Sequence, residues 1–163
     1  MAARGAERGG CDGAAQGQPP QVQAWTQDQV RAFLAVAEGD QYGPVWQIAL
    51  MTVLRRGELL ALRWEGADLD RGVLHVRRAL VERGSKLVFQ EPKTKSGRRV
   101  VAPSHSCVAA LRTHRSTQLE RRLAPGPAWR DEGLVFTTAD GGPIAPRNLI
   151  RRFGELCRQA GLP

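Results

Sequence analysis

The sequence is short of cysteines and of long apolar segments. Its three cysteines, Cys11, Cys107 and Cys157, lie far apart and form no Cys-x-x-Cys pair. An odd number of distant cysteines argues against a disulfide scaffold and against a zinc site, and favours a reducing compartment. The longest apolar run, residues 45–54, is about half as long as a membrane span, and the amino terminus has no apolar signal segment. We therefore expect a cytoplasmic protein that holds no metal ion.

Acidic residues are also few, which leaves a basic chain. The 163 residues include 24 Lys and Arg against 16 Asp and Glu, a net charge of +8. The first 24 residues contain two arginines and two acidic residues, so the surplus belongs to the rest of the chain. A basic folded region suggests a polyanionic partner such as DNA or RNA. The alternative is an arginine-rich protein from a GC-rich genome.

Residues 1–24 differ in composition from the rest of the chain. They consist mainly of Gly, Ala, Gln and Pro, with almost no large apolar side chain. Such a segment cannot offset the entropy lost on ordering, which predicts a disordered tail, or else a reading frame entered at the wrong place. Residues 25–163 are long enough to form one domain with a buried core.

Apolar spacing predicts several helices in this domain. Thr26 and Gln29 have the spacing of a capping box, and a second helix is expected to begin near Pro44. A short third helix is expected over residues 58–62. Two further helices are expected: one capped by Ser104 with Val108, Leu111, Arg115 and Leu119 on one face, and a last one with Leu149, Ile150, Phe153 and Leu156 before Gly161.

Alternating residues between these helices predict strands. Residues 73–78, 87–89 and 99–102 are the candidates, with Gly84 and Gly97 supplying turns, and a short strand is expected at 134–137. The order of helices, strands and helices predicts an α+β fold in which helices flank a small three-stranded antiparallel sheet.

The most informative string runs from Thr52 to Trp64. Arg55 stands between an apolar helix and an apolar segment, where a charge is costly unless another group holds it. Glu58 follows three residues later, on the same face of a helical turn, and can pair with Arg55. The alternative is a helix-end salt pair beside a solvated Arg56.

A second string, residues 91–100, places four cations between two predicted strands. These are Lys93, Lys95, Arg98 and Arg99. By itself such a segment is typical of a solvated basic turn, but it could also display the four cations on a hairpin for phosphate groups.

Taken together, the two strings resemble motifs of the tyrosine recombinase (phage-type integrase) family. The first resembles Thr-Gly-Leu-Arg-x-Gly-Glu-Leu, with Val53 at the usual glycine, where a tight turn would strain a β-branched residue. The resemblance implies that Arg55 clamps the scissile phosphate and that Glu58 supports it. It also implies that Lys93 helps to protonate the leaving 5′ oxygen, and that Lys95, Arg98 and Arg99 contact the DNA backbone.

The resemblance covers about residues 24–163 and becomes less specific toward the end. Residues 146–148 begin the last helix, whose start is made basic by Arg147, Arg151 and Arg152. The resemblance implies that Arg147 and Arg151 contact DNA; the alternative is a solvated helix face. The family acts on double-stranded DNA without a cofactor or small-molecule substrate. The implied partners are therefore double-stranded DNA and other integrase protomers, with no membrane.

Two parts of the family's catalytic set are not found. Its chemistry requires a tyrosine that forms a phosphotyrosyl bond and a His-x-x-Arg pair, both after the lysine hairpin. The single tyrosine, Tyr42, precedes Arg55, and the letters His75 to Arg78 precede the hairpin. We expect Tyr42 to pack at a helix start.

These observations predict the amino-terminal half of a recombinase catalytic domain, without a nucleophile and unable to cleave DNA alone. The alternative is a non-catalytic DNA-binding remnant or a partner of an intact integrase. In a half domain the apolar residues of the last helix would be partly uncovered.

Overall fold

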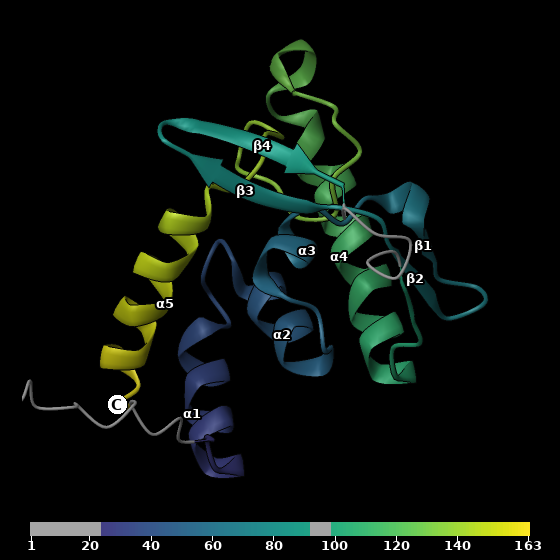
Figure 1. Ribbon diagram of the computed structural model, residues 1–163. Helices are drawn as coiled ribbons and strands as arrows, with labels where there is room; N and C mark the ends of the chain where they lie inside the picture. Colours follow the sequence, from purple (N-terminus) through teal and green to yellow (C-terminus); the bar gives the residue numbers. More distant parts are fainter. Residues whose placement is uncertain (1–23, 92–98) are drawn as a thin grey trace, which may run out of the picture.

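The computed structural model describes residues 24–91 and 99–163. The expected tail, apart from its last residue, and the basic residues Lys93, Lys95 and Arg98 with the expected turn at Gly97 lie outside the described residues. In the described part no helix is long and apolar enough to cross a bilayer. The helices are α1 (Gln27–Ala37), α2 (Gly43–Met51), α3 (Arg56–Leu60), α4 (His105–Leu123) and α5 (Pro146–Gln159), with short 3-10 turns η1 (Trp64–Gly66) and η3 (Gly126–Ala128) (Figure 1).

The helix ends follow the predicted local signals. The Thr26 side chain accepts a hydrogen bond from the Gln29 backbone N–H, and the Gln29 side chain accepts one from the Thr26 N–H, which is a complete capping box. Ser104 caps α4 through the Cys107 N–H. At the end of α5, Gly161 adopts a φ of 66°, the left-handed conformation that glycine favours.

The strands form two small antiparallel sheets. Strands β1 (Ala67–Asp68), β2 (Val73–Val76) and β5 (Arg99–Val101) make a three-stranded sheet in the order β1-β2-β5. Strands β3 (Ala79–Arg83) and β4 (Lys86–Gln90) make a separate ribbon, closed by a turn at Gly84 with a φ of 60°. The α+β class and the three-stranded antiparallel sheet are confirmed.

The membership of that sheet was predicted wrongly. Residues 87–89 lie in β4 and pair with β3, because the tight turn at Gly84 returns the chain along the strand it has just left. β2 pairs instead with β5, so that Val76 lies opposite Arg99. Residues 134–137 form no strand; one bridge between Arg63 and Leu134 takes its place. The missed strands β1 and β3 carry only short runs of alternation.

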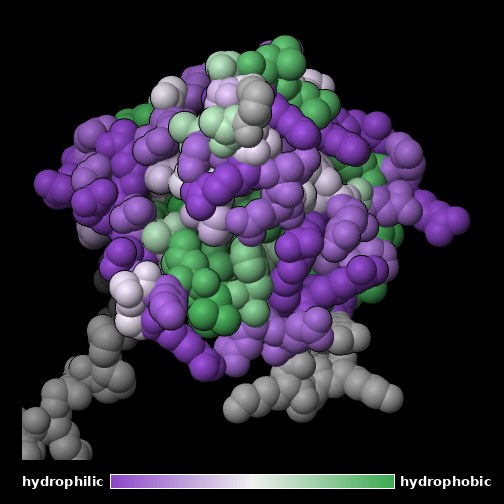
Figure 2. All heavy atoms as spheres, turned by 90° about the horizontal axis from the view of Figure 1, so that it is seen from above, coloured by the Kyte–Doolittle hydropathy of each residue, from purple (hydrophilic) through white to green (hydrophobic). Residues whose placement is uncertain are grey.

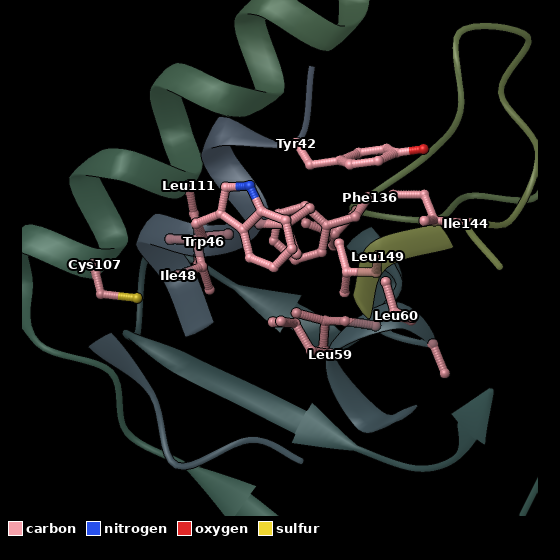
Figure 3. Packing of buried hydrophobic residues seen from close by; sticks show 14 of the residues in the cluster. Tyr42, Trp46, Ile48, Leu59, Leu60, Cys107, Leu111, Phe136, Ile144 and Leu149 are labelled. Atoms are coloured by element: carbon pink, nitrogen blue, oxygen red, sulfur yellow. The ribbon is translucent and has the colours of Figure 1, made fainter. Parts of the chain in front are cut away.

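The core lies between α2, α3, α4 and the start of α5 (Figure 3). The buried side chains that converge there include Trp46, Leu60, Leu111 and Leu149. One predicted face was wrong: Leu119 of α4 is 56% exposed, and the buried stripe of that helix runs instead through Cys107, Leu111 and Gln118. Apolar spacing therefore predicted the wrong buried face for α4, because that face includes the polar residue Gln118.

Helix α5 lies beside α1 (Figure 1), and this contact covers part of the face expected to be open. Leu149 and Leu156 are buried, contrary to the expectation, whereas Ile150 is 53% and Phe153 38% exposed. The Phe153 ring stacks on Trp25 with centroids 5.6 Å apart and also contacts Phe33 and Trp46. Seen from above, most of the visible surface is hydrophilic, with apolar areas near the middle and at the top of the view (Figure 2).

A buried ion pair also fixes α5 to the rest of the domain. Asp40, in the turn after α1, has a side chain only 3% exposed and accepts a 2.6 Å hydrogen bond from Arg152 Nε in α5. Its other hydrogen bonds come from the Tyr42 backbone N–H at 2.9 Å and from the Trp46 indole at 3.4 Å. One carboxylate therefore joins the start of α2 to α5, although Asp40 and Arg152 are 112 residues apart in sequence.

Two polar side chains of α4 hold the segment around Val135. Gln118 donates to the carbonyls of Leu134 and Val135 and accepts a 2.6 Å bond from the Trp64 indole. His114 Nε2 lies 2.7 Å from the Val135 carbonyl, so it carries the proton, and its buried Nδ1 has no partner. Burial, above all, lowers the pKa of His114; the bond to Val135 opposes this and the charge of Arg121 adds to it.

This histidine should make the protein less stable in mild acid. Because the pKa of His114 is lowered in the folded state, the unfolded chain binds a proton near pH 6.5 at this residue and the folded chain does not. We expect the free energy of unfolding to fall below pH 6.5, by at most about 1.4 kcal/mol per pH unit from this residue. Urea unfolding at pH 7.5 and 5.5 measures the difference. His114→Gln should reduce this difference in stability between the two pH values, whereas substitution of the exposed His105 by Gln should not. An equal pH dependence in all three proteins would contradict the role given to His114.

Candidate functional site

A groove of about 710 Å³ opens where α3, β3 and the start of α5 meet. Its charged lining residues are four arginines, Arg55, Arg56, Arg78 and Arg147, and three acids, Glu58, Glu82 and Glu91. Val76, Leu80 and Ile150 supply apolar walls. The groove thus brings the arginine motif and the start of the last helix, which are about 90 residues apart in sequence, to one place.

Arg55 stands immediately before α3, in an extended conformation, with its side chain 80% exposed. Glu58 in α3 is only 10% exposed and binds Arg55 at two points. Its Oε2 accepts a 2.8 Å hydrogen bond from the Arg55 backbone N–H, and its Oε1 lies 3.5 Å from the guanidinium. The predicted pair is therefore present. The short backbone bond fixes the main chain of Arg55, while the guanidinium faces solvent, where it could bind an anion.

Arg99 approaches the same carboxylate from β5. Its guanidinium donates to Glu58 Oε2 at 2.8 Å and to the Val53 carbonyl at 3.0 Å, and its side chain is 33% exposed. The sequence grouped Arg99 with the cations of the hairpin. In the folded protein, Arg99 instead contacts the loop that carries Arg55.

Gly57 explains how α3 lies so close to β3. A Cβ atom at this position would be 2.9 Å from the Leu80 carbonyl oxygen and 3.3 Å from the Ala79 Cβ. Real Cβ atoms do not approach backbone oxygen so closely, and only glycine fits between the two elements. The recombinase motif that the sequence resembles includes this glycine, but the strand against which Gly57 packs was not predicted.

Val53 is not strained at the position usually held by glycine in the resembling motif. No non-glycine residue in the described ranges has a positive φ, and the Val53 side chain is 79% exposed. The strain that a tight turn would cause is therefore not seen, since Val53 does not have a positive φ and Thr52, directly before it, is extended.

The two arginines predicted on α5 have different surroundings. Arg147 lines the groove but forms a 2.9 Å ion pair with Glu82 of β3. Arg151 lies on the exposed surface of α5. Arg78, which was not among the predicted site residues, also lines the groove and stacks over the Phe89 ring at 5.2 Å.

Tyr42 packs at the start of α2, as expected, and is 8% exposed. Burial raises the pKa of its phenol and Asp40 raises it further, while Arg151 lowers it. A raised pKa makes the nucleophilic phenolate harder to form. Tyr42 also lines a different cavity from Arg55, together with His114 and Phe136. Among residues 24–91 and 99–163, no three His, Cys, Asp or Glu side chains gather as metal ligands.

The fold resembles that of DNA recombinases of known structure. The Tn1549 transposon integrase in complex with transposon right end DNA matches with a TM-score of 0.73 and 24% identity, over 90% of this chain and 47% of the integrase. The XerA recombinase matches with a TM-score of 0.62 and 21% identity, over 88% of this chain and 45% of the other. The architecture is thus that of tyrosine recombinases and integrases.

Sequence comparison identifies relatives of the same kind. A tyrosine recombinase XerC-like protein of Caldanaerobacter subterraneus is 29% identical over 155 residues, which is 88% of this chain and 40% of the relative. An integrase of Streptomyces ambofaciens is 34% identical over 89% of this chain and 38% of its own length. No protein-family model matches. The chain is homologous to tyrosine recombinases and integrases, and it spans about 40% of the length of these relatives.

Proposed function

We propose that this chain is the DNA-binding part of a site-specific recombinase and that it holds a backbone phosphate at Arg55. Residues 25–163 would be the first part of the catalytic domain, acting on double-stranded DNA in the cytoplasm. In the intact reaction, Arg55 would clamp the scissile phosphate, Glu58 would support Arg55, and Lys93 would approach from the segment between β4 and β5. Lys95, Arg98, Arg147 and Arg151 would contact neighbouring phosphates.

The single observation that carries this proposal is the arrangement around Arg55. Its backbone is fixed by a buried carboxylate at 2.8 Å, while its guanidinium is 80% exposed beside a groove lined by other arginines. A guanidinium held in this way presents several N–H donors to a phosphate and binds it in a defined direction. An ordinary surface salt bridge would have two solvated partners, whereas Glu58 is 10% exposed.

By itself this chain would bind DNA without cutting it. The family reaction needs a tyrosine to attack phosphorus, and the only tyrosine here has a buried phenol with a raised pKa at the start of α2. Loss of a donor such as Arg55 would weaken a reaction, but loss of the nucleophile removes it. Strand breakage and rejoining would therefore require residues supplied by another chain or another part of the protein.

Binding of a short duplex DNA at several salt concentrations tests the proposal. We expect the logarithm of the binding constant to fall by roughly 0.9 per log unit of salt for each phosphate contacted. Arg55→Ala and Lys93→Ala should each weaken binding and lower this slope by about one.

The matched control is Arg31→Ala. Arg31 is an equally exposed arginine, 74% against 80% for Arg55, and pairs with Asp28 on α1. It should leave the slope unchanged. Equal losses in the Arg31 and Arg55 variants would indicate attraction by net charge alone, and a duplex that does not bind would overturn the proposal.

A further inference from the structure

Arg99 contacts both ends of the loop that presents Arg55. Its NH2 group donates to the Val53 carbonyl, before Arg55, and to Glu58 Oε2, after it. The same Oε2 atom accepts the Arg55 backbone N–H. Two donors therefore meet at one carboxylate oxygen, one from β5 and one from the loop itself, and the β5 donor also binds the Val53 carbonyl of that loop.

Glu58 requires such a partner because it is nearly buried. A carboxylate that is 10% exposed is costly unless charge and hydrogen bonds compensate it. Arg99 supplies the short charged contact, at 2.8 Å, whereas the Arg55 guanidinium lies farther away, at 3.5 Å. Because Arg99 satisfies Glu58, the Arg55 guanidinium can leave it for an anion without leaving a buried charge alone.

We propose that Arg99 is a positioning residue that aligns Arg55 for phosphate binding through Glu58 and the Val53 carbonyl, rather than a residue that contacts DNA itself. This inference rests on the proposed phosphate site at Arg55. It gives the start of β5 a role that its position next to the basic segment 92–98 in the sequence does not suggest. Arg99 directly follows this segment in the sequence, and its contacts with Val53 and Glu58 tie the start of β5 to the loop that carries Arg55.

A double-mutant cycle separates positioning from direct contact. Arg99→Gln should weaken binding of a short duplex by roughly five- to tenfold, as expected for one lost phosphate contact, and lower the salt slope by about one. In an Arg55→Ala background the same substitution should have no further effect, because the residue through which it acts is gone. Additive losses would overturn the inference and identify Arg99 as a DNA contact.

Arg112 provides the matched control. Like Arg99, it bridges a backbone carbonyl and a carboxylate, donating to Leu69 O at 3.0 Å and to Asp70 at 2.6 Å. Arg112→Gln removes the same charge but lies outside the groove, so DNA binding should stay unchanged. Because one nitrogen of Arg99 makes both contacts, Arg99→Lys, whose ammonium has three donors, should restore most of the affinity lost in Arg99→Gln.

A measurement without DNA distinguishes failure of this inference from failure of the proposed function. The backbone N–H of Arg55 donates a hydrogen bond to Glu58. Its hydrogen should exchange with deuterium roughly tenfold faster in Arg99→Gln, whereas Arg112→Gln should leave the exchange rate unchanged. Unchanged exchange in Arg99→Gln would overturn the positioning role. If Arg99→Gln speeds the exchange of the Arg55 amide while Arg55→Ala binds DNA as well as the unaltered protein, that result would support the positioning of Arg55 by Arg99 and overturn the proposed phosphate site.

Discussion

Gly57→Ala should destabilise the protein by about 1–3 kcal/mol, the usual cost of adding a methyl group to a packed contact. The new Cβ would meet the Leu80 carbonyl oxygen at 2.9 Å. Backbone atoms cannot rotate away as a side chain end can, so α3 and β3 must separate. Glu58 lies one residue further along α3, and the loop bearing Arg55 would move with it. Urea unfolding followed by tryptophan fluorescence measures the loss.

Substitution of Gly154 by alanine should have the opposite effect on stability. Gly154 lies within α5, and nothing lies within 4 Å of the position that its Cβ would take. Alanine there should raise the free energy of unfolding by about 0.5–1 kcal/mol, because it restricts the unfolded chain and favours the helix. If Gly57→Ala raised the free energy of unfolding as Gly154→Ala is expected to, the close approach of α3 to β3 would be contradicted.

Asp40→Ala should lower the free energy of unfolding by about 2–4 kcal/mol. It removes the acceptor of the Tyr42 N–H and the Trp46 indole, and it leaves Arg152 with Glu155 as its remaining carboxylate partner. The effect is large because the Asp40 side chain is only 3% exposed, so water cannot easily replace it. Denaturant unfolding at pH 7 checks the magnitude.

Asp70→Ala is the control for this loss. Asp70 forms an equally short ion pair, 2.6 Å with Arg112, but its side chain is 90% exposed. We expect a change within about 0.5 kcal/mol, as for most surface pairs. Similar losses at both positions would show that burial does not set the strength of the Asp40 contact.

The sequence predicted the site better where its contacts are local. Arg55 and Glu58 are three residues apart, so helical spacing alone was enough to pair them. The contact of Arg99 with Glu58 spans 41 residues and depends on the pairing of β5 with β2, and no spacing rule reaches that far. For the same reason the packing of Gly57 against β3 and the groove position of Arg78 were not foreseen.

The fold shows the same division. Capping residues such as Thr26 and Ser104 act on the next three residues, and both predicted helix starts were right. The pairing of strands was less accurate, because alternation along a strand does not identify its neighbour. The buried stripe of α4 was also misplaced, since Gln118 is buried only through its bonds to Trp64 and the Val135 region.

The contacts of Arg99 also imply an order of events during folding. The two hydrogen bonds that fix the loop around Arg55 span 41 and 46 residues. Contacts of that separation form late, because the intervening chain must first lose conformational freedom. While the chain is still being synthesised, Arg55 would leave the ribosome well before Arg99. The loop around Arg55 should therefore reach its final geometry only after β5 has joined β2, so the proposed phosphate site would form only once the domain is largely folded.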